Sequence, residues 1–338
     1  MPAGSLANAE RGGNLIALLE DGGFKASGYS KGGPSSFSGM SYLFGWDGRP
    51  QEFGSQLGIN ELDVAIAGDD WINERILELK LSYNTDINLE RALSLNRGKV
   101  RIVAIATKDN PDNIDDILKQ IVKNKTLITV ATEMPYLTLN WIQQKLKQLD
   151  LLAKYPNHSV QKYKTPPLID NGIVIYETWG KTEAKVKNDG ADLGTEITQS
   201  GSAIRNYDLK IVDEILRSES SIWINPEIKN DPDKNDLLEL FLINIYGAVN
   251  AENKVMLSFN APKNCEAEIE AYLTENNLFA DEPTKTIGKE YTEFYVQIDM
   301  ENPETPLAKV RYQLAKLGAK HIDTIPLSSS IPSINAIR

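Results

Sequence analysis

The chain has 338 residues, of which 41% are hydrophobic and 25% charged, and its formal net charge is −11. This composition excludes a disordered chain and fits two or three globular domains, and the acidic balance argues against general binding to nucleic acid or to an acidic membrane. The single cysteine, Cys265, excludes internal disulfides. The sequence shows neither a signal-peptide pattern nor an apolar run long enough to span a membrane, so we expect a cytoplasmic protein.

The first 250 residues alternate between helical and strand patterns. A helix is predicted within 14–24, and the buried strand near 62–68 leads through a turn at Gly68-Asp69 into a helix that opens at Trp71. Further strand patterns lie at 100–107, 126–132 and 172–178, with a helix at 113–123. This alternation predicts an α/β fold with mainly parallel sheets.

Residues 192–216 place two acids, a small-residue turn and a helical pattern in one segment. A short alternating run carries Asp192 and Glu196, the turn is Ser200-Gly201-Ser202-Ala203, and a long helix is predicted after it. A turn that leads into a helix offers free backbone N–H groups and hydroxyls, which suit a phosphate, and Glu196 is placed to hold ribose hydroxyls. The alternative is an ordinary turn and helix cap.

Other polar residues leave two interpretations open. Glu183 and Asp192 are candidates to bind Mg²⁺ or substrate, or else belong to a solvated charged loop. Asp70 follows a buried strand at its carboxyl end, where α/β folds bind ligands, or it caps the next helix. Arg49, beside Pro50, lies in a turn, where a lone arginine is normally at the surface.

The C-terminal part of the chain has its own order of strand and helix patterns. Strand patterns at 254–261, 284–300 and 321–327 alternate with helical patterns at 267–276 and 306–318, giving the order β-α-β-β-α-β. This order predicts a separate ferredoxin-like domain.

Several segments, in order, resemble long-form ATP phosphoribosyltransferase, the enzyme that opens histidine biosynthesis. "GADLGTEITQSGSAI" (190–204) resembles the family's "GLADAIVDLVSTGATL", with Ala191-Asp192, Glu196 and Ser200-Gly201 at matching positions. "EILRSESSIWINP" (214–226) resembles "EILESTARLIANP" without a gap.

The resemblance extends over nearly the whole chain. "GINELDVAIAGDDWINE" (58–74) is similar to "GxADLGITGxDWLxE", and "WGKTEAKV" (179–186) to "SGSVEVAP", which places Asp70 and Glu183 on motif acids. "KVMLSFNAP" and "LGAKHIDTIPL" resemble the two ends of the family's regulatory domain.

The chain also departs from the family pattern in its cations. The family's "LPKGRL" strand is replaced by "MPAGSL", with Ala3 and Ser5 at the Lys and Arg positions, and the arginine of an "SRKL"-like loop is absent. Arg49, in "RPQEF", is the arginine that persists, and Ala203 replaces a motif threonine. Fewer cations therefore face the pyrophosphate, and Lys25 or Lys31 are possible substitutes.

The resemblance implies two α/β domains of the type II periplasmic-binding-protein kind around a cleft, followed by a ferredoxin-like regulatory domain. The implied bounds are 1–105 with 205–250, then 106–204, and last 253–330. The implied reaction joins N1 of ATP to C1 of phosphoribosyl pyrophosphate and releases pyrophosphate.

The resemblance also implies roles and partners. Arg49 and Mg²⁺ hold the pyrophosphate, and Glu196 holds the ribose hydroxyls. The remaining substrate contacts are Asp70, Glu183, Asp192, Ser200, Gly201, Ser202, Ala203 and Ile204. Histidine is the expected effector, and a homo-oligomer between dimer and hexamer is expected. The alternative is a catalytically weak or inactive paralogue that serves as a regulatory or small-molecule-binding protein.

Overall fold

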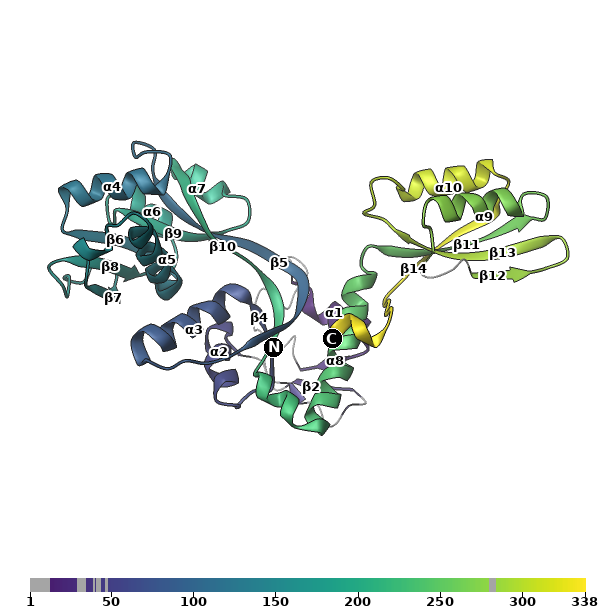
Figure 1. The fold of residues 1–338 in the computed structure, drawn as a ribbon, viewed down its shortest axis with the longest axis horizontal. Helices are drawn as coiled ribbons and strands as arrows, with labels where there is room; N and C mark the ends of the chain where they lie inside the picture. The colour runs from purple at the N-terminus through teal and green to yellow at the C-terminus, as the bar shows by residue number, and fades with distance from the viewer. Residues whose placement is uncertain (1–12, 29–34, 39, 41–43, 46–47, 280–283) are drawn as a thin grey trace. The chain divides into compact units, whose positions relative to one another are not determined.

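The computed structural model describes residues 13–28, 35–38, 40, 44–45, 48–279 and 284–338 (Figure 1). The chain divides into two compact units. One comprises Met1–Asn14, Lys31–Ser35 and Gly45–Asp231, and the other Leu15–Ser30, Ser36–Phe44 and Pro232–Arg338. The three-domain bounds expected from the sequence remain a prediction. Within the described ranges no helix combines the length and apolar character needed to span a membrane.

The first unit is built on a seven-stranded sheet with the strand order β4-β10-β5-β9-β6-β8-β7. Its strands are β4 (Val64–Gly68), β5 (Glu90–Thr107), β6 (Leu127–Thr132), β7 (His158–Lys162), β8 (Gly172–Glu177), β9 (Leu193–Thr198) and β10 (Leu209–Ile224). Pairings among β9, β6, β8 and β7 are parallel, whereas β4, β10, β5 and β9 pair antiparallel. The α/β fold is therefore confirmed. The predicted mainly parallel arrangement holds for one half of the sheet only, since the strands of the other half pair antiparallel.

Strands β5 and β10 are unusually long, with 18 and 16 residues, and pair with each other along most of their length (Figure 1). The long helix predicted after Ala203 is wrong: α7 (Ser202–Asn206) is a single turn, and β10 begins at Leu209. Its helical pattern was overridden because β10 pairs with β5 along most of its length and with β4 at its end, and pairing context outweighs local propensity in sheets.

Helices pack against the β4 and β10 side of this sheet and against its parallel half. They are α2 (Pro50–Gly58), α3 (Asp69–Tyr83), α4 (Ile114–Asn124), α5 (Pro135–Gln148) and α6 (Thr182–Lys187), with the 3-10 turns η3 (Leu152–Lys154) and η4 (Pro226–Asn230). In α4 the buried residues Ile114, Ile117, Leu118 and Ile121 form one apolar stripe, and Asn113 caps the helix by accepting the Asp116 N–H. Full burial of each such side chain contributes about 1.5–3 kcal/mol.

Helix α3 begins two residues earlier than predicted. Gly68, in an extended conformation, is its N-cap residue, so that Asp69 and Asp70 occupy the first turn. Carboxylates in a first helical turn interact favourably with the helix dipole. The shift brings both acids next to β10.

In the second unit, α1 (Leu15–Asp21) packs against α8 (Pro232–Ala251). A small sheet with the order β1-β2-β3 comprises β1 (Ala26–Ser27), β2 (Ser35–Phe37) and β3 (Phe44–Gly45). The phenyl rings of Phe24 and Phe241 lie 5.0 Å apart and join this N-terminal segment to α8.

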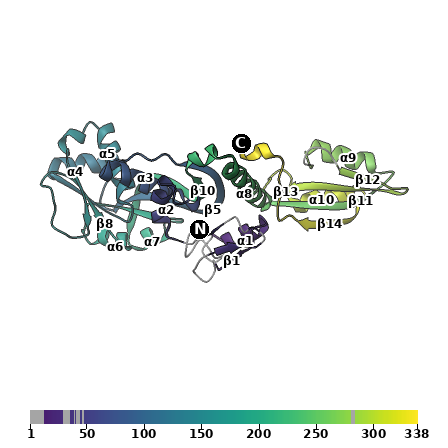
Figure 2. The ribbon, with the colours of Figure 1, turned by 90° about the horizontal axis from the view of Figure 1, so that it is seen from below.

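The end of the chain has the predicted β-α-β-β-α-β order. It comprises β11 (Lys254–Pro262), α9 (Glu266–Glu275), β12 (Thr284–Ile287), β13 (Tyr291–Asp299), α10 (Leu307–Lys316) and β14 (Lys320–Pro326), followed by η5 (Ile334–Ile337). The four strands form one antiparallel sheet (Figure 2). Leu273 of α9 and Leu314 of α10 share one core with the stacked rings of Phe259 and Phe294, so both helices cover the same face.

Candidate active site

Glu196 lies near the carboxyl end of β9, and part of its side chain is buried without a partner. Its Oε2 atom has no hydrogen-bond partner among the described residues, while the Thr182 hydroxyl and the Ile197 backbone hydrogen-bond to the carboxylate. Burial first, then the charges of Glu183 and Glu133, raise the pKa of Glu196 to about 7. A buried acceptor without a donor is costly, so the arrangement suits a ligand that brings hydroxyl groups.

The turn after β9 leads directly into α7, and the phosphate site predicted there remains a prediction. Gly201 is the N-cap of α7 with φ 71°, and its N–H donates to Thr198 Oγ1 at 2.9 Å. The first helical N–H groups, at Ser202, Ala203 and Ile204, have no acceptor within a helix. Ser200 Oγ lies 3.4 Å from the Ser202 nitrogen, which leaves the next two amides for a ligand. A positive φ favours glycine at 201, because a side chain is strained there.

Glu183, in the first turn of α6, lies close to Glu196. Its side chain is buried and is near enough to influence the pKa of Glu196. The structure therefore brings together two of the predicted site residues, Glu183 and Glu196.

Asp192 is at the opposite end of β9. Its carboxylate accepts hydrogen bonds from the Thr129 N–H at 2.9 Å and the Thr129 hydroxyl at 2.8 Å, and it forms an ion pair with Lys125. It also lines a cavity of about 440 Å³ together with Lys164. The structure does not bring Asp192 to the turn at Ser200.

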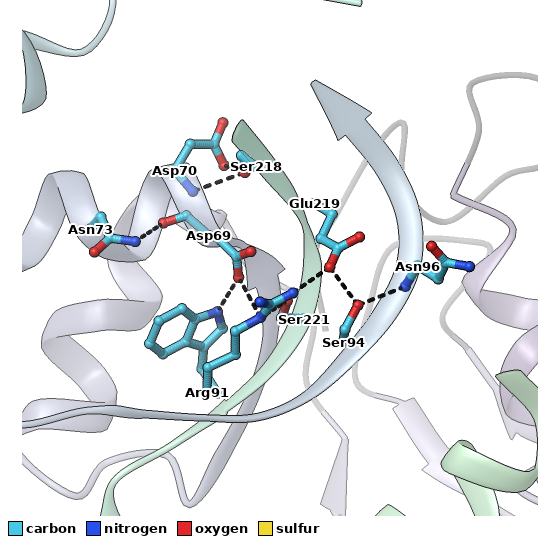
Figure 3. Close-up of polar contacts among 10 residues, drawn as sticks. Asp69, Asp70, Asn73, Arg91, Ser94, Asn96, Ser218, Glu219 and Ser221 are labelled. Carbon is cyan, nitrogen blue, oxygen red and sulfur yellow. Dashed lines mark hydrogen bonds and ion pairs between the residues drawn. The ribbon is translucent and has the colours of Figure 1, made fainter. Parts of the chain in front are cut away.

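Asp70 is held by β10. The Asp70 N–H donates to Ser218 Oγ at 3.0 Å, and the Ser218 hydroxyl donates to Asp70 Oδ1 at 2.9 Å (Figure 3). Burial raises the pKa of Asp70, and the Ser218 hydrogen bond opposes the shift. Asp70 therefore joins the start of α3 to β10.

The cationic residues predicted to face pyrophosphate either are exposed or lie outside the described residues. Arg49 is exposed just before α2, and within the described ranges its guanidinium makes no hydrogen bond or ion pair. Lys25 is exposed as well. Ala3, Ser5 and Lys31 lie outside the described residues.

Strands β5 and β10 and helix α3 form a charged cluster that was not predicted from the sequence. Arg91 Nε donates to Ser221 Oγ at 2.8 Å and lies 3.4 Å from Asp69 Oδ1, and Arg91 also forms an ion pair with Glu219 (Figure 3). Burial raises the pKa of Asp69, while Ser221 and Arg91 oppose the shift.

This cluster borders a cavity of about 560 Å³. Its lining residues are Asp69, Arg91, Lys99, Val100, Arg101, Gln199, Arg217, Ser218 and Glu219. The pairing of β5 with β10 brings most of these residues together, with Asp69 from α3 and Gln199 from the end of β9, and no local sequence signal records such a pairing.

Across the described ranges, no three His, Cys, Asp or Glu side chains are grouped so as to hold a metal ion. The acids around Glu196 therefore do not form a protein-only metal site.

Comparison with known proteins gives a consistent result. A family model described as ATP phosphoribosyltransferase matches residues 49–246. ATP phosphoribosyltransferase 1 of Geobacter sulfurreducens is 24% identical over 343 residues, covering 98% of this chain and 97% of that protein. ATP phosphoribosyltransferase of Trichlorobacter lovleyi is 26% identical over 287 residues, covering 84% of this chain and 83% of that protein.

A solved ATP phosphoribosyl transferase complex from Thermotoga maritima is also similar. It superposes with a TM-score of 0.49 at 16% identity, covering 72% of this chain and 96% of that chain.

Proposed function

Since the chain belongs to the ATP phosphoribosyltransferase family, we propose that its active site lies at the carboxyl end of β9, between Glu196 and the Ser200 turn. The enzyme joins N1 of ATP to C1 of phosphoribosyl pyrophosphate and releases pyrophosphate, the first step of histidine biosynthesis. The comparisons do not favour the alternative of an inactive paralogue.

The observation that supports this location is the Glu196 carboxylate, whose Oε2 atom is buried without a partner. We assign it to the ribose hydroxyls, which supply the missing donors. The Ala203 and Ile204 amides, at the start of α7, then receive the 5′-phosphate. Binding the sugar at both ends fixes C1, so that alignment of the two substrates provides much of the rate.

The chemistry requires charge stabilisation on both sides of C1. N1 forms a bond to C1 while the bond from C1 to the pyrophosphate oxygen breaks, and the electron pair leaves with pyrophosphate. Positive charge grows on the ribose, where the carboxylates of Glu196 and Glu183 stabilise it. Negative charge grows on the pyrophosphate, where we place the exposed guanidinium of Arg49.

Asp70 and Asp192 act differently under this proposal. Their carboxylates bind Ser218 and Thr129, both protein groups. We therefore assign them positioning roles, in which Asp70 fixes β10 and Asp192 fixes the start of β9.

Mg²⁺ dependence is part of the proposal, although the described acids do not fit a protein-only site. Mg²⁺ usually retains waters and is held through substrate phosphates. We therefore expect the ion to arrive with the polyphosphate substrates, and we assign no step to it.

We also propose a cytoplasmic homo-oligomer, between dimer and hexamer, with histidine as the effector of the C-terminal domain. A protein lacking 253–338 should lose both its native mass and its inhibition by histidine. Inhibition that survives the deletion would place the effector site elsewhere, and full activity of the intact protein in millimolar histidine would leave assembly as the role of the domain.

The decisive experiment is an assay of the purified protein with ATP, phosphoribosyl pyrophosphate and Mg²⁺, following the absorbance of phosphoribosyl-ATP. Wild-type protein should turn over, and Glu196→Gln should be slowed with its fold intact. A folded wild-type protein that forms no product would refute the proposed function.

A further inference from the structure

Three cations of the central strands line the 560 Å³ cavity: Lys99, Arg101 and Arg217. Arg101 and Arg217 are directly opposite each other in the β5–β10 pairing. Lys99 precedes Arg101 by two residues, beside a register shift in the same pairing, and lines the cavity with it. The three basic side chains therefore border one cavity.

The face that carries Arg101 also carries the Ser200 turn. Arg101 is also opposite Thr198 in the β5–β9 pairing, and opposite residues of antiparallel strands share a face with Cβ atoms about 4.5–5.5 Å apart. The Thr198 hydroxyl accepts the Gly201 N–H, and Gln199 lines the cavity. The cavity is therefore continuous with the segment to which we assign the 5′-phosphate.

These cations are only partly neutralised. Glu214 is shared by two of them, with Oε2 at 3.3 Å from Arg101 Nη1 and Oε1 at 2.6 Å from Arg217 Nε. Lys99 is exposed and makes no ion pair with any described residue. Arg217 lines the cavity and its side chain is 81% exposed, so its guanidinium is accessible to a ligand. The group carries a net positive charge in a chain whose net charge is −11.

Arg217 lies at a position where the chain differs from the motif that it resembles. It stands in "EILRSES" where the related motif reads "EILESTA", so a cation replaces an acid.

We propose that Lys99, Arg101 and Arg217 bind a diphosphate group and stabilise it as it leaves, an inference that rests on the proposed function. Guanidinium forks match phosphate oxygens in two parallel hydrogen bonds, and Lys99 adds a point charge. Both substrates carry such a group, the pyrophosphate of phosphoribosyl pyrophosphate and the triphosphate of ATP. The continuity with the Ser200 turn favours the former.

Binding of inorganic pyrophosphate with Mg²⁺, measured by titration calorimetry on the full-length protein, tests the proposal without turnover. Arg217→Gln should weaken binding by about tenfold or more, the effect of losing a hydrogen bond between charged groups. Glu214→Gln should strengthen it several-fold, because Arg101 and Arg217 lose their shared acid. Lys123→Gln, the same charge change on the exposed face of α4, is the matched control.

Steady-state kinetics then identify the occupant. A rise in the KM for phosphoribosyl pyrophosphate alone in Arg217→Gln assigns the cations to that substrate, and a rise for ATP alone assigns them to the triphosphate. Arg217→Lys should rescue only in part. Pyrophosphate affinity that is the same in wild type, Arg217→Gln and Glu214→Gln would overturn the inference even in an active enzyme. A wild-type protein without turnover that still shows these opposite shifts would refute the proposed function alone.

Discussion

Replacing Glu196 with glutamine should flatten the pH dependence of phosphoribosyl pyrophosphate use between pH 6 and 8. The pKa of Glu196 is raised to about 7, mainly by burial. At such a pKa about a tenth of the carboxyl groups are ionised at pH 6 and about nine tenths at pH 8. If the ionised form accepts the ribose hydroxyls, kcat/KM for this substrate should rise nearly tenfold over that range in the wild type.

At pH 8 the glutamine variant should be about 10 to 100 times weaker, since a hydrogen bond to a charged group contributes about 1.5–3 kcal/mol. The substrate phosphate also titrates near pH 6, but it does so equally for both proteins. The ratio of their kcat/KM values therefore isolates Glu196. Glu275→Gln, an exposed carboxylate on α9, should behave as the wild type.

Stability should change in the opposite sense. The folded-state pKa of Glu196 is raised from 4.5, so its contribution to stability is present at low pH and is lost as pH rises through 7. Relative to Glu196→Gln, the free wild type should lose up to about 2 kcal/mol of unfolding free energy between pH 5.5 and 8. A kcat/KM ratio that stays constant from pH 6 to 8 would show that this carboxylate does not meet the substrate in its ionised form.

Three further changes test other parts of the site. Gly201→Val should raise the KM for phosphoribosyl pyrophosphate more than that for ATP, because φ at residue 201 is 71° and a Cβ there would lie 3.2 Å from Arg205 Nη1. A KM for phosphoribosyl pyrophosphate that is equal in the wild type and the variant would remove the phosphate assignment. Arg49→Ala should lower kcat by about 10²-fold or more if its charge stabilises the leaving group, with partial rescue by lysine, and unchanged turnover would exclude it. Glu74 accepts the Tyr136 and Leu137 N–H groups at 2.8 and 2.7 Å, and burial raises its pKa to about 7. Urea unfolding should therefore show the wild type losing about 2 kcal/mol relative to Glu74→Gln from pH 5.5 to 8, and equal losses would contradict this.

The sequence predicted the elements that depend on local patterns. The ferredoxin-like order at the end of the chain followed from alternating strands and helices, and α4 from its apolar stripe and Asn113 cap. The family resemblance located Glu196 and the turn at Gly201, because their spacing along one short segment is itself the motif. These features need no knowledge of distant pairing.

The features that the sequence did not predict depend on contacts between distant segments. The residues of β10 have charges at helical spacing, but they form a strand because they pair with β5 along most of their length and with β4 at the end. The cavity at Arg101 and Arg217 could not be foreseen, because the two residues are opposite each other only through that strand. The burial that shifts the pKa of Glu196 likewise arises from packing between separate elements.

The position of β10 also determines when the first unit can fold. In the sheet β4 is an edge strand whose neighbour is β10. Residues 64–68 therefore cannot pair until residues more than 150 positions later in the chain have been synthesised. During synthesis the amino-terminal strands leave the ribosome with open edges and apolar side chains before their partner exists. Such delayed, non-local pairing slows folding and exposes chains to aggregation. Truncations that end before residue 224 should therefore yield aggregates rather than a smaller folded unit, and chaperones that hold nascent chains should raise the yield of the whole protein.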